Sequence, residues 1–373
     1  MSTRPRIAHF GIKYYPSQGG SSRVAELLVQ QGREHSDITI YCYKNPMAAD
    51  YFPGVRVVQM PQFPFGSLGV FLYYTLCCIH LCLFGQYDLI HVHKTDSAFF
   101  IPFLRLKARV LATSQEAPYR RDKWGKIGKQ YFKFMERWFV YSGATLTAVS
   151  KPLTEYYQRR YGRPVHFIPN FVDVDTEYDD TAADKLLEAH GVKGGYVLFS
   201  ARRIMATKGC HTLLQALQRI NYIGTVVIVG QYSHMPEYSK QLKTLAQGLD
   251  VVFVGYIASK SVLMSLVKKA KYFIFPSENE GMSLMLLEVA STGTPIIGSD
   301  IPENTTVFTE QEMLFFKNRS SEDLAEKFQW VWNHPEEMQE MAALARRKVS
   351  NQYGAQTVAE QYFQLYESPT INA

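Results

Sequence analysis

Short apolar runs typical of buried strands alternate with segments of helical periodicity along almost the whole chain. In the first such unit, a strand is expected over Ile7 to Ile12 and a helix over Ser22 to Gln31. The loop between them contains Gly19 and Gly20. Repeated strand-loop-helix units wind helices around a parallel sheet, so the pattern predicts an α/β protein.

The alternation occurs in two series. At 373 residues, the chain is longer than one hydrophobic core usually serves. The pattern breaks at Pro169 and Asn170 and continues through the acidic, irregular stretch 176–184, where we expect a linker. We predict two Rossmann-like, doubly wound domains over 1–172 and 173–354, with a C-terminal helix over 355–370 that packs back on the first. Because parallel sheets bind ligands at the carboxyl ends of their strands, the domains are expected to face a central cleft. The further strands predicted are Ile38 to Tyr43, Leu89 to His93, Val110 to Thr113, Thr145 to Val149, Tyr196 to Ser200, Val226 to Val229, Val251 to Val254, Tyr272 to Phe275 and Pro295 to Ile297.

Composition favours a globular protein in a reducing compartment. Hydrophobic residues make up 46% and charged residues 20% of the chain, which excludes a disordered segment of low hydrophobicity. The five cysteines show neither a disulfide framework nor zinc-ligand spacing. The stretch from Met1 to Ile12 lacks the long apolar core of a signal peptide. We therefore expect a cytoplasmic protein.

The segment Leu68 to Phe84 is strongly apolar and long enough to suggest a transmembrane helix. It contains His80 and directly precedes a predicted strand, so a transmembrane helix is rejected. The favoured interpretation is a buried helix of the first domain, and the alternative is a helix that dips partly into a bilayer.

A polar loop in the second half carries the clearest chemical pattern. Tyr272 to Pro276 ends a strand, and a helix is expected over Met282 to Thr292. Glu280 lies in the intervening loop and Glu288 about two turns into the helix, so both can point toward one ligand across the helix start. The first N–H groups of a helix bind anions.

The stretch E-G-M-S-L-M-L-L-E from Glu280 to Glu288, followed by T-G-T-P, resembles the E-x7-E region of family 4 retaining glycosyltransferases, which have the GT-B fold. Arg203 to Gly209 resembles the R-x4-K-G motif of that family, and Gly19 and Gly20 its amino-terminal glycine loop. Pro169, Asn170 and Asp173 resemble its P-N-G-V-D linker. The segment R-R-D-K-W-G, residues 120–125, is similar to a bacterial rhamnosyltransferase subgroup of cell-surface polysaccharide assembly.

The resemblance implies that the protein transfers a sugar, with retention, from a nucleotide diphosphate donor to a lipid-linked saccharide acceptor, as in O-antigen and lipopolysaccharide synthesis. It assigns Glu288 to the ribose hydroxyls and Glu280 to the donor sugar. Arg203 and Lys208 can stabilise the leaving diphosphate without a metal or other cofactor. The alternative is that both are solvated surface charges. The predicted catalytic residues are Glu280, Arg203 and Lys208, and the donor-binding residues are Glu288, Gly281, Met282, Ser283, Leu284, Gly19, Gly20, Gly230, Gly255 and Tyr256.

Several positions depart from the family pattern. Ser283 and Phe171 stand where glycine is usual, as does Arg202, which precedes the arginine of the R-x4-K-G motif. Gln115 stands where the family often has a histidine, and an amide forms hydrogen bonds but cannot act as a base. Retaining chemistry tolerates this, because a leaving phosphate oxygen on the same face can accept the proton. Glu116 is the alternative acceptor.

Two patterns invite a metal-binding interpretation, which we do not favour. His91 and His93 share a strand face, but the sequence offers no third ligand, and zinc sites need three or four. Asp173 and Asp175 form a D-x-D, but they fall in the predicted linker.

The basic segment Arg120 to Arg137 predicts an amphipathic helix. Lys126, Lys129, Lys133 and Arg137 form one stripe, and Trp124, Ile127, Tyr131, Phe134 and Trp138 form another. Either the aromatic residues enter the core and the lysines face water, or the helix lies on anionic lipid. The second interpretation predicts a peripheral protein on the inner face of the cell membrane.

Two other function classes remain open. A nucleotide-sugar epimerase has the same two-domain architecture but needs no acceptor. A noncatalytic binder of nucleotide sugar or nucleic acid is disfavoured, because the sequence contains no recognised nucleic-acid module.

Overall fold

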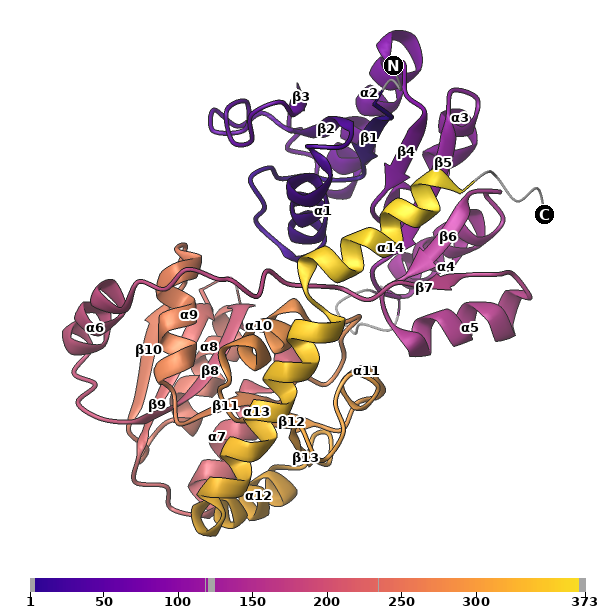
Figure 1. The fold of residues 1–373 in the computed structure, drawn as a ribbon. Coiled ribbons are helices and arrows are strands. Elements are labelled where there is room, and N and C mark those ends of the chain that lie inside the picture. The colour runs from indigo at the N-terminus through magenta and orange to yellow at the C-terminus, as the bar shows by residue number, and fades with distance from the viewer. Residues whose placement is uncertain (1–3, 118, 120–124, 234, 369–373) are drawn as a thin grey trace. The chain divides into compact units, whose positions relative to one another are not determined.

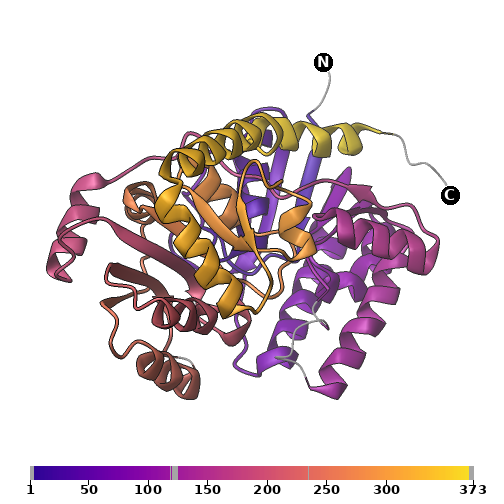
Figure 2. The same cartoon turned by 90° about the horizontal axis from the view of Figure 1, so that it is seen from below.

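The computed structural model describes residues 4–117, 119, 125–233 and 235–368. The chain divides into two compact units, the first comprising Met1–Val172 with Ala355–Ala373 and the second Asp173–Gly354. Each unit contains one parallel sheet with helices on both faces (Figures 1 and 2).

The first unit has a seven-stranded sheet in the order β3-β2-β1-β4-β5-β6-β7. Alternate residues of β2 pack on opposite faces. Ile38 and Ile40 pack with α1, whereas Tyr41 and Tyr43 pack with α2. The elements are β1 (Arg6–Phe10), α1 (Gly20–Gly32), β2 (Asp37–Tyr43), β3 (Arg56–Met60), α2 (Gly66–Phe84), β4 (Leu89–Val92), η1 (Thr95–Phe100), α3 (Ile101–Arg105), β5 (Arg109–Ser114), α4 (Lys126–Val140), β6 (Thr145–Ala148), α5 (Lys151–Tyr161), β7 (His166–Phe167) and α14 (Ala355–Glu367).

The second unit has a six-stranded sheet in the order β10-β9-β8-β11-β12-β13. Its elements are α6 (Asp180–Ala189), β8 (Tyr196–Arg203), η3 (Ala206–Lys208), α7 (Cys210–Arg219), β9 (Thr225–Gln231), α8 (Pro236–Leu245), β10 (Val251–Gly255), α9 (Lys260–Lys269), β11 (Tyr272–Phe275), α10 (Leu284–Thr292), β12 (Ile296–Ser299), α11 (Pro302–Thr305), β13 (Leu314–Phe316), α12 (Ser321–Asn333) and α13 (Pro335–Gln352).

Strand order reverses direction once in each sheet, between β1 and β4 and between β8 and β11. Ligands of open α/β sheets bind beside such a reversal, at the carboxyl ends of the strands. In the second unit this places the segments after Arg203 and after Phe275 side by side, because β8 and β11 pair directly.

The sequence pattern missed three strands, β3, β7 and β13, and each lies at an edge of its sheet. Edge strands have only one neighbour and are less completely buried, so their apolar signal is weak. The stretch 176–184, predicted to be irregular, includes the start of α6, where the Asp179 side chain accepts a hydrogen bond from the Ala182 N–H.

Helix α2 differs from the favoured prediction of a buried helix. One face packs on the sheet through Tyr73, Tyr74, Cys77, Cys78 and Leu81, but most of the helix remains outside the core. It is the one helix in the described ranges long and apolar enough to cross a membrane, by length and composition alone.

The two histidines of β4 have a third histidine beside them, which the sequence did not reveal. His9 of β1 lies next to His93, with its Nδ1 2.8 Å from Nε2 of His93, and the rings of His91 and His93 stack at 3.8 Å. Both ring nitrogens of His91 have hydroxyl partners at 2.7 Å, Tyr366 of α14 and Thr113 of β5. A metal ion would have to displace one of these hydroxyls, so the cluster forms a hydrogen-bonded link between the sheet and α14.

This cluster should make stability depend on pH. Burial lowers the pKa of His9 to about 3, and it lowers the pKa values of His91 and His93 well below the ordinary value. Below pH ~6.5 the unfolded chain therefore binds protons that the folded chain does not. We expect the free energy of unfolding to fall by about 1 kcal/mol per histidine between about pH 7.5 and 5.5. Thermal melts of wild type and His9→Gln across this range check the expectation, and equal pH slopes for the two proteins would contradict it.

Candidate functional site

The loop between β11 and α10 carries Glu280 and is held from both sides. The Ser277 hydroxyl donates to Oε1 of Glu280 at 2.7 Å, and the Ser277 carbonyl accepts a hydrogen bond of 2.6 Å from the Ser299 hydroxyl. The following helix starts at Leu284 rather than at Met282, because the Ser283 side chain caps it by accepting from the Leu286 N–H at 3.3 Å. Gly281 and Met282 therefore lie in the loop, and the N–H of Leu284 is among those that the helix itself leaves unpaired.

A second loop, after β8, fits closely against the first. Gly209 has φ +70°, and a Cβ atom there would lie 1.9 Å from the Pro276 carbonyl oxygen. The Glu278 N–H donates to the Thr207 carbonyl at 2.9 Å. The glycine of the R-x4-K-G motif is thus required for the approach of these two loops.

The interlocked loops bring two predicted catalytic residues together. The Lys208 ammonium lies 2.5 Å from Oε1 of Glu280, whose side chain is only 8% exposed. Arg203, the last residue of β8, is exposed and lies opposite Gln231 of β9. An ammonium has three N–H donors, so Lys208 can contact Glu280 and an anion at once.

Glu288 is paired with a residue that the sequence analysis missed. Lys260, the first residue of α9, lies 2.9 Å from Oε1 of Glu288, and the Glu288 side chain is 15% exposed. A lysine in the first turn of a helix is unfavourable, because the helix dipole is positive there. The position of Lys260 in the sequence was therefore a signal that it pairs with an acidic side chain of another segment.

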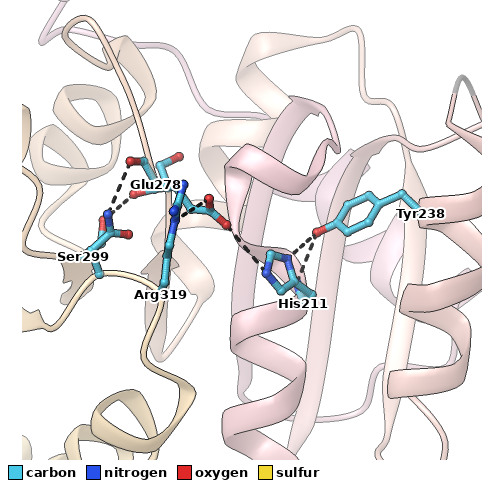
Figure 3. A network of polar contacts seen from close by, with 7 residues as sticks. His211, Tyr238, Glu278, Ser299 and Arg319 are labelled. Carbon is cyan, nitrogen blue, oxygen red and sulfur yellow. Dashed lines mark hydrogen bonds and ion pairs between the residues drawn. The ribbon is translucent and has the colours of Figure 1, made fainter. Parts of the chain in front are cut away.

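Glu278 joins three segments around the site, as Figure 3 shows. Its Oε2 accepts a 2.8 Å hydrogen bond from Nε of Arg319, and its Oε1 lies 3.6 Å from Nε2 of His211. His211 in turn contacts the Tyr238 hydroxyl at 2.9 Å. Burial lowers the pKa of His211, and the nearby Glu278 carboxylate partly opposes this change. Glu278 belongs to the polar loop that the sequence predicted, whereas Arg319, His211 and Tyr238 lie outside every predicted motif.

Three other predicted donor-binding residues lie at the carboxyl ends of β9 and β10, where Gly230 is the second-last residue of β9, Gly255 is the last residue of β10 and Tyr256 follows it. Gly230 has φ +146°, and a Cβ atom there would lie 1.9 Å from the Ala201 carbonyl oxygen, which gives this glycine a packing role. Gly255 has φ +84° and open space around it, and Tyr256 is exposed.

The remaining predicted site residues lie in the first unit. Gly19 is the N-cap of α1 and Gly20 its first residue. The buried Glu26 anchors the loop before them, because its carboxylate accepts a 2.6 Å hydrogen bond from the Ser17 N–H. Glu26 also forms an ion pair with Arg23. The sequence analysis identified neither Glu26 nor Arg23. Gln115 and Glu116 directly follow β5, and Nε2 of Gln115 is buried with no hydrogen-bond partner in the described residues.

The D-x-D and the basic segment also have defined places. Oδ1 of Asp173 accepts a hydrogen bond from the Asp175 N–H at 3.1 Å, which forms a local turn.

In the basic segment, the predicted residues Arg120 to Trp124 lie outside the described residues, and helix α4 runs from Lys126 to Val140. Its aromatic stripe is largely exposed, since Ile127, Tyr131 and Phe134 all face solvent, whereas Met135 and Phe139 are buried.

Two family profiles match the chain. Residues 18–176 match Glycosyltransferase Family 4, and residues 184–348 match Glycosyl transferases group 1. The second match contains Arg203, Lys208, Glu280 and Glu288.

Three curated relatives show how far the similarity extends. D-inositol 3-phosphate glycosyltransferase of Xylanimonas cellulosilytica is 25% identical over 81% of this chain and 82% of its own length. D-rhamnosyltransferase WbpZ of Pseudomonas aeruginosa is 32% identical over 38% of this chain and 37% of its own. N,N'-diacetylbacillosaminyl-diphospho-undecaprenol alpha-1,3-N-acetylgalactosaminyltransferase of Campylobacter jejuni is 23% identical over 46% of this chain and 44% of its own.

Solved structures share the fold. Anabaena HepE, crystallised with UDP and glucose, superposes with a TM-score of 0.79 and 16% identity, covering 98% of this chain and 100% of that one. Two parallel-sheet Rossmann-like domains of this kind define the GT-B fold. The chain is therefore a glycosyltransferase of the GT-B type, built from a Glycosyltransferase Family 4 domain and a Glycosyl transferases group 1 domain.

Proposed function

We propose that the protein transfers a sugar from a nucleotide diphosphate donor to a lipid-linked saccharide, with retention and without a metal, in the assembly of a cell-surface polysaccharide. The observation that carries the donor half of this proposal is the juxtaposition of Lys208, Glu280 and the start of α10 at the strand-order reversal of the second sheet. Solved relatives of the fold support it, since HepE was crystallised with UDP and glucose.

The proposed step breaks the bond between sugar C1 and the diphosphate and forms one between C1 and an acceptor hydroxyl oxygen. Negative charge develops on the leaving phosphate, where Arg203, Lys208 and the free N–H groups at the start of α10 can stabilise it. Glu280 accepts hydrogen bonds from the sugar, and Glu288 from the ribose. The acceptor proton passes to a leaving phosphate oxygen on the same face. Gln115, whose amide nitrogen has no hydrogen-bond partner among the described residues, orients a substrate hydroxyl rather than acting as a base.

Thermal shift against a panel of nucleotide sugars tests donor binding. A donor at about 100 times its dissociation constant should add about 2.7 kcal/mol to the free energy of unfolding. Both this shift and sugar transfer should persist in EDTA. Activity that EDTA abolishes and manganese restores would contradict metal independence. Epimerisation of the donor without any acceptor would instead favour the epimerase hypothesis.

Glu278 should act by positioning the donor loop. The substitution Glu278→Gln keeps the shape of the side chain but removes the charge that faces Arg319 and His211. We expect KM for the donor to rise roughly fivefold to tenfold while kcat stays within about twofold, because the contacts with the reacting atoms remain. Steady-state kinetics check this, with Glu340→Gln on the exposed face of α13 as the control. A fall in kcat at unchanged KM would instead assign Glu278 to the chemical step.

The acceptor half of the proposal is supported by two curated relatives. The Campylobacter relative is named for an undecaprenol diphosphate acceptor and the Pseudomonas relative for rhamnosyl transfer, which supports a lipid-linked acceptor and a rhamnosyltransferase-like subgroup. We further infer a cytoplasmic enzyme that attaches peripherally to the inner face of the cell membrane. The lysines of α4 would supply the attraction to anionic lipid, each contributing on the order of 1 kcal/mol.

A further inference from the structure

Helix α2 presents an apolar stripe to solvent. Leu68, Leu72, Leu76, Ile79 and Leu83 recur every three or four residues, so they lie on one side of the helix, opposite its core-facing tyrosines. Leu68 is 60% and Leu83 is 69% exposed, and Ile79 is also exposed. Helix α2 contains no Asp, Glu, Lys or Arg. An apolar surface of this extent marks an interaction site.

The stripe continues onto α3 and α4. The Cys82 thiol lies 3.9 Å from the Phe103 carbonyl oxygen, and Phe103 and Leu106 are exposed. Phe103 contacts Phe99, with ring centroids 6.1 Å apart, and Phe99 contacts Trp138 of α4 at 5.5 Å. Beyond Trp138, the exposed Phe134 completes the series at 6.1 Å. The apolar surface therefore crosses three helices of the first unit.

Positively charged side chains lie beside this surface. On α4, Lys126, Lys133 and Arg137 are exposed. Glu136 is the one acidic residue of α4, and it is buried, where it accepts hydrogen bonds from the Tyr156 and Tyr161 hydroxyls. Apolar side chains next to exposed lysine and arginine are complementary to the acyl chains and phosphates of an anionic bilayer.

We propose that α2, α3 and α4 form one lipid-binding surface, in which the α2 stripe inserts into the bilayer interface while the basic residues of α4 bind lipid phosphates. This inference rests on the proposed membrane attachment and adds an apolar anchor to it. Helix α2 lies along the interface rather than across the membrane, because the Tyr73 hydroxyl donates to the Ile12 carbonyl at 2.5 Å and the Tyr74 hydroxyl to the Gly11 carbonyl at 3.3 Å. A second copy of the chain is a poorer occupant, since a twofold contact on this face would bring equivalent cationic stripes together.

The salt dependence of binding distinguishes the electrostatic contacts of α4 from the apolar contacts of α2. Attraction between α4 and lipid phosphates is screened within about 8 Å at physiological ionic strength, whereas insertion of α2 is not. Binding of the full chain to vesicles of phosphatidylcholine and phosphatidylglycerol should therefore weaken as salt rises but persist at high salt.

The test is vesicle co-sedimentation, at low and high salt, without nucleotide sugar or acceptor. The variant Ile79→Ser with Leu83→Ser should bind about 100-fold more weakly, roughly tenfold for each side chain, and should lose the salt-resistant component. The matched control, Ile223→Ser with Leu344→Ser, removes two exposed apolar side chains of the second unit and should bind as wild type does. Lys126→Glu, Lys129→Glu and Lys133→Glu together should weaken binding mainly at low salt.

Wild-type affinity of the double variant at high salt would overturn the proposal. So would a wild-type dimer that becomes monomeric in the double variant with unchanged vesicle binding, because the surface would then bind protein. Thermal shift with nucleotide sugars on the same samples reports the proposed function separately. If no nucleotide sugar binds, the proposed function is contradicted. The vesicle measurements would still test, independently, whether α2, α3 and α4 bind lipid.

Discussion

The Lys208→Met variant should transfer sugar about 100 to 1,000 times more slowly than the wild-type protein, a rise in the barrier of roughly 3 to 4 kcal/mol. The reason is that Lys208 lies beside Glu280, where the leaving diphosphate is proposed to develop charge. Methionine keeps much of the side-chain volume but cannot stabilise that charge. The loss should appear mainly in kcat, because the interaction strengthens in the transition state.

Release of nucleotide diphosphate in a steady-state assay measures this effect. Lys243→Met, on the exposed surface of α8, is the matched control and should keep wild-type activity. Removing Lys208 leaves the mostly buried Glu280 without its cation, so a thermal melt must show that the variant is folded. A folded Lys208→Met protein with wild-type kcat would exclude Lys208 from the reaction. By the same reasoning, Arg203→Ala and Glu288→Ala should each abolish most transfer.

The Gly209→Ala variant should be destabilised by about 3 kcal/mol or more in its second unit and should lose activity. Alanine at φ +70° is strained, and its Cβ would also meet the Pro276 carbonyl oxygen at 1.9 Å. The clash can be relieved only by moving the loop that carries Glu280 away from the loop that carries Lys208. Both stability and catalysis should therefore fall together.

The Gly248→Ala variant separates the backbone strain at positive φ from the steric clash with the neighbouring loop. Gly248 has φ +83°, but a Cβ atom there would meet nothing within 4 Å, so its replacement carries the backbone strain alone. We expect a cost of about 1 to 2 kcal/mol and normal activity for that variant. Chemical denaturation of both proteins measures the difference, and equal destabilisation would show that the loops do not need the close approach at Gly209.

Much of the fold was evident from the sequence because central parallel strands are buried on both faces and leave continuous apolar runs. The strand expected over Tyr272 to Phe275 is β11 as the structure has it, and the α/β architecture follows from the alternation of such runs with helices. The strands β3, β7 and β13 were missed because an edge position requires less apolar sequence. The family resemblance likewise rested on contiguous motifs, which a linear pattern preserves.

Tertiary structure alone decided which distant side chains meet. Lys260 reaches Glu288, Arg319 reaches Glu278 and His9 joins the histidines of β4 because strand order, not sequence separation, sets which segments are neighbours. It also decided which apolar residues face the core. The sequence determined that α2 is apolar, but only the packing of Tyr73 and Tyr74 on the sheet left Leu68 and Leu83 toward solvent. Composition reports how much apolar surface a helix has, whereas its neighbours determine how much of that surface is covered.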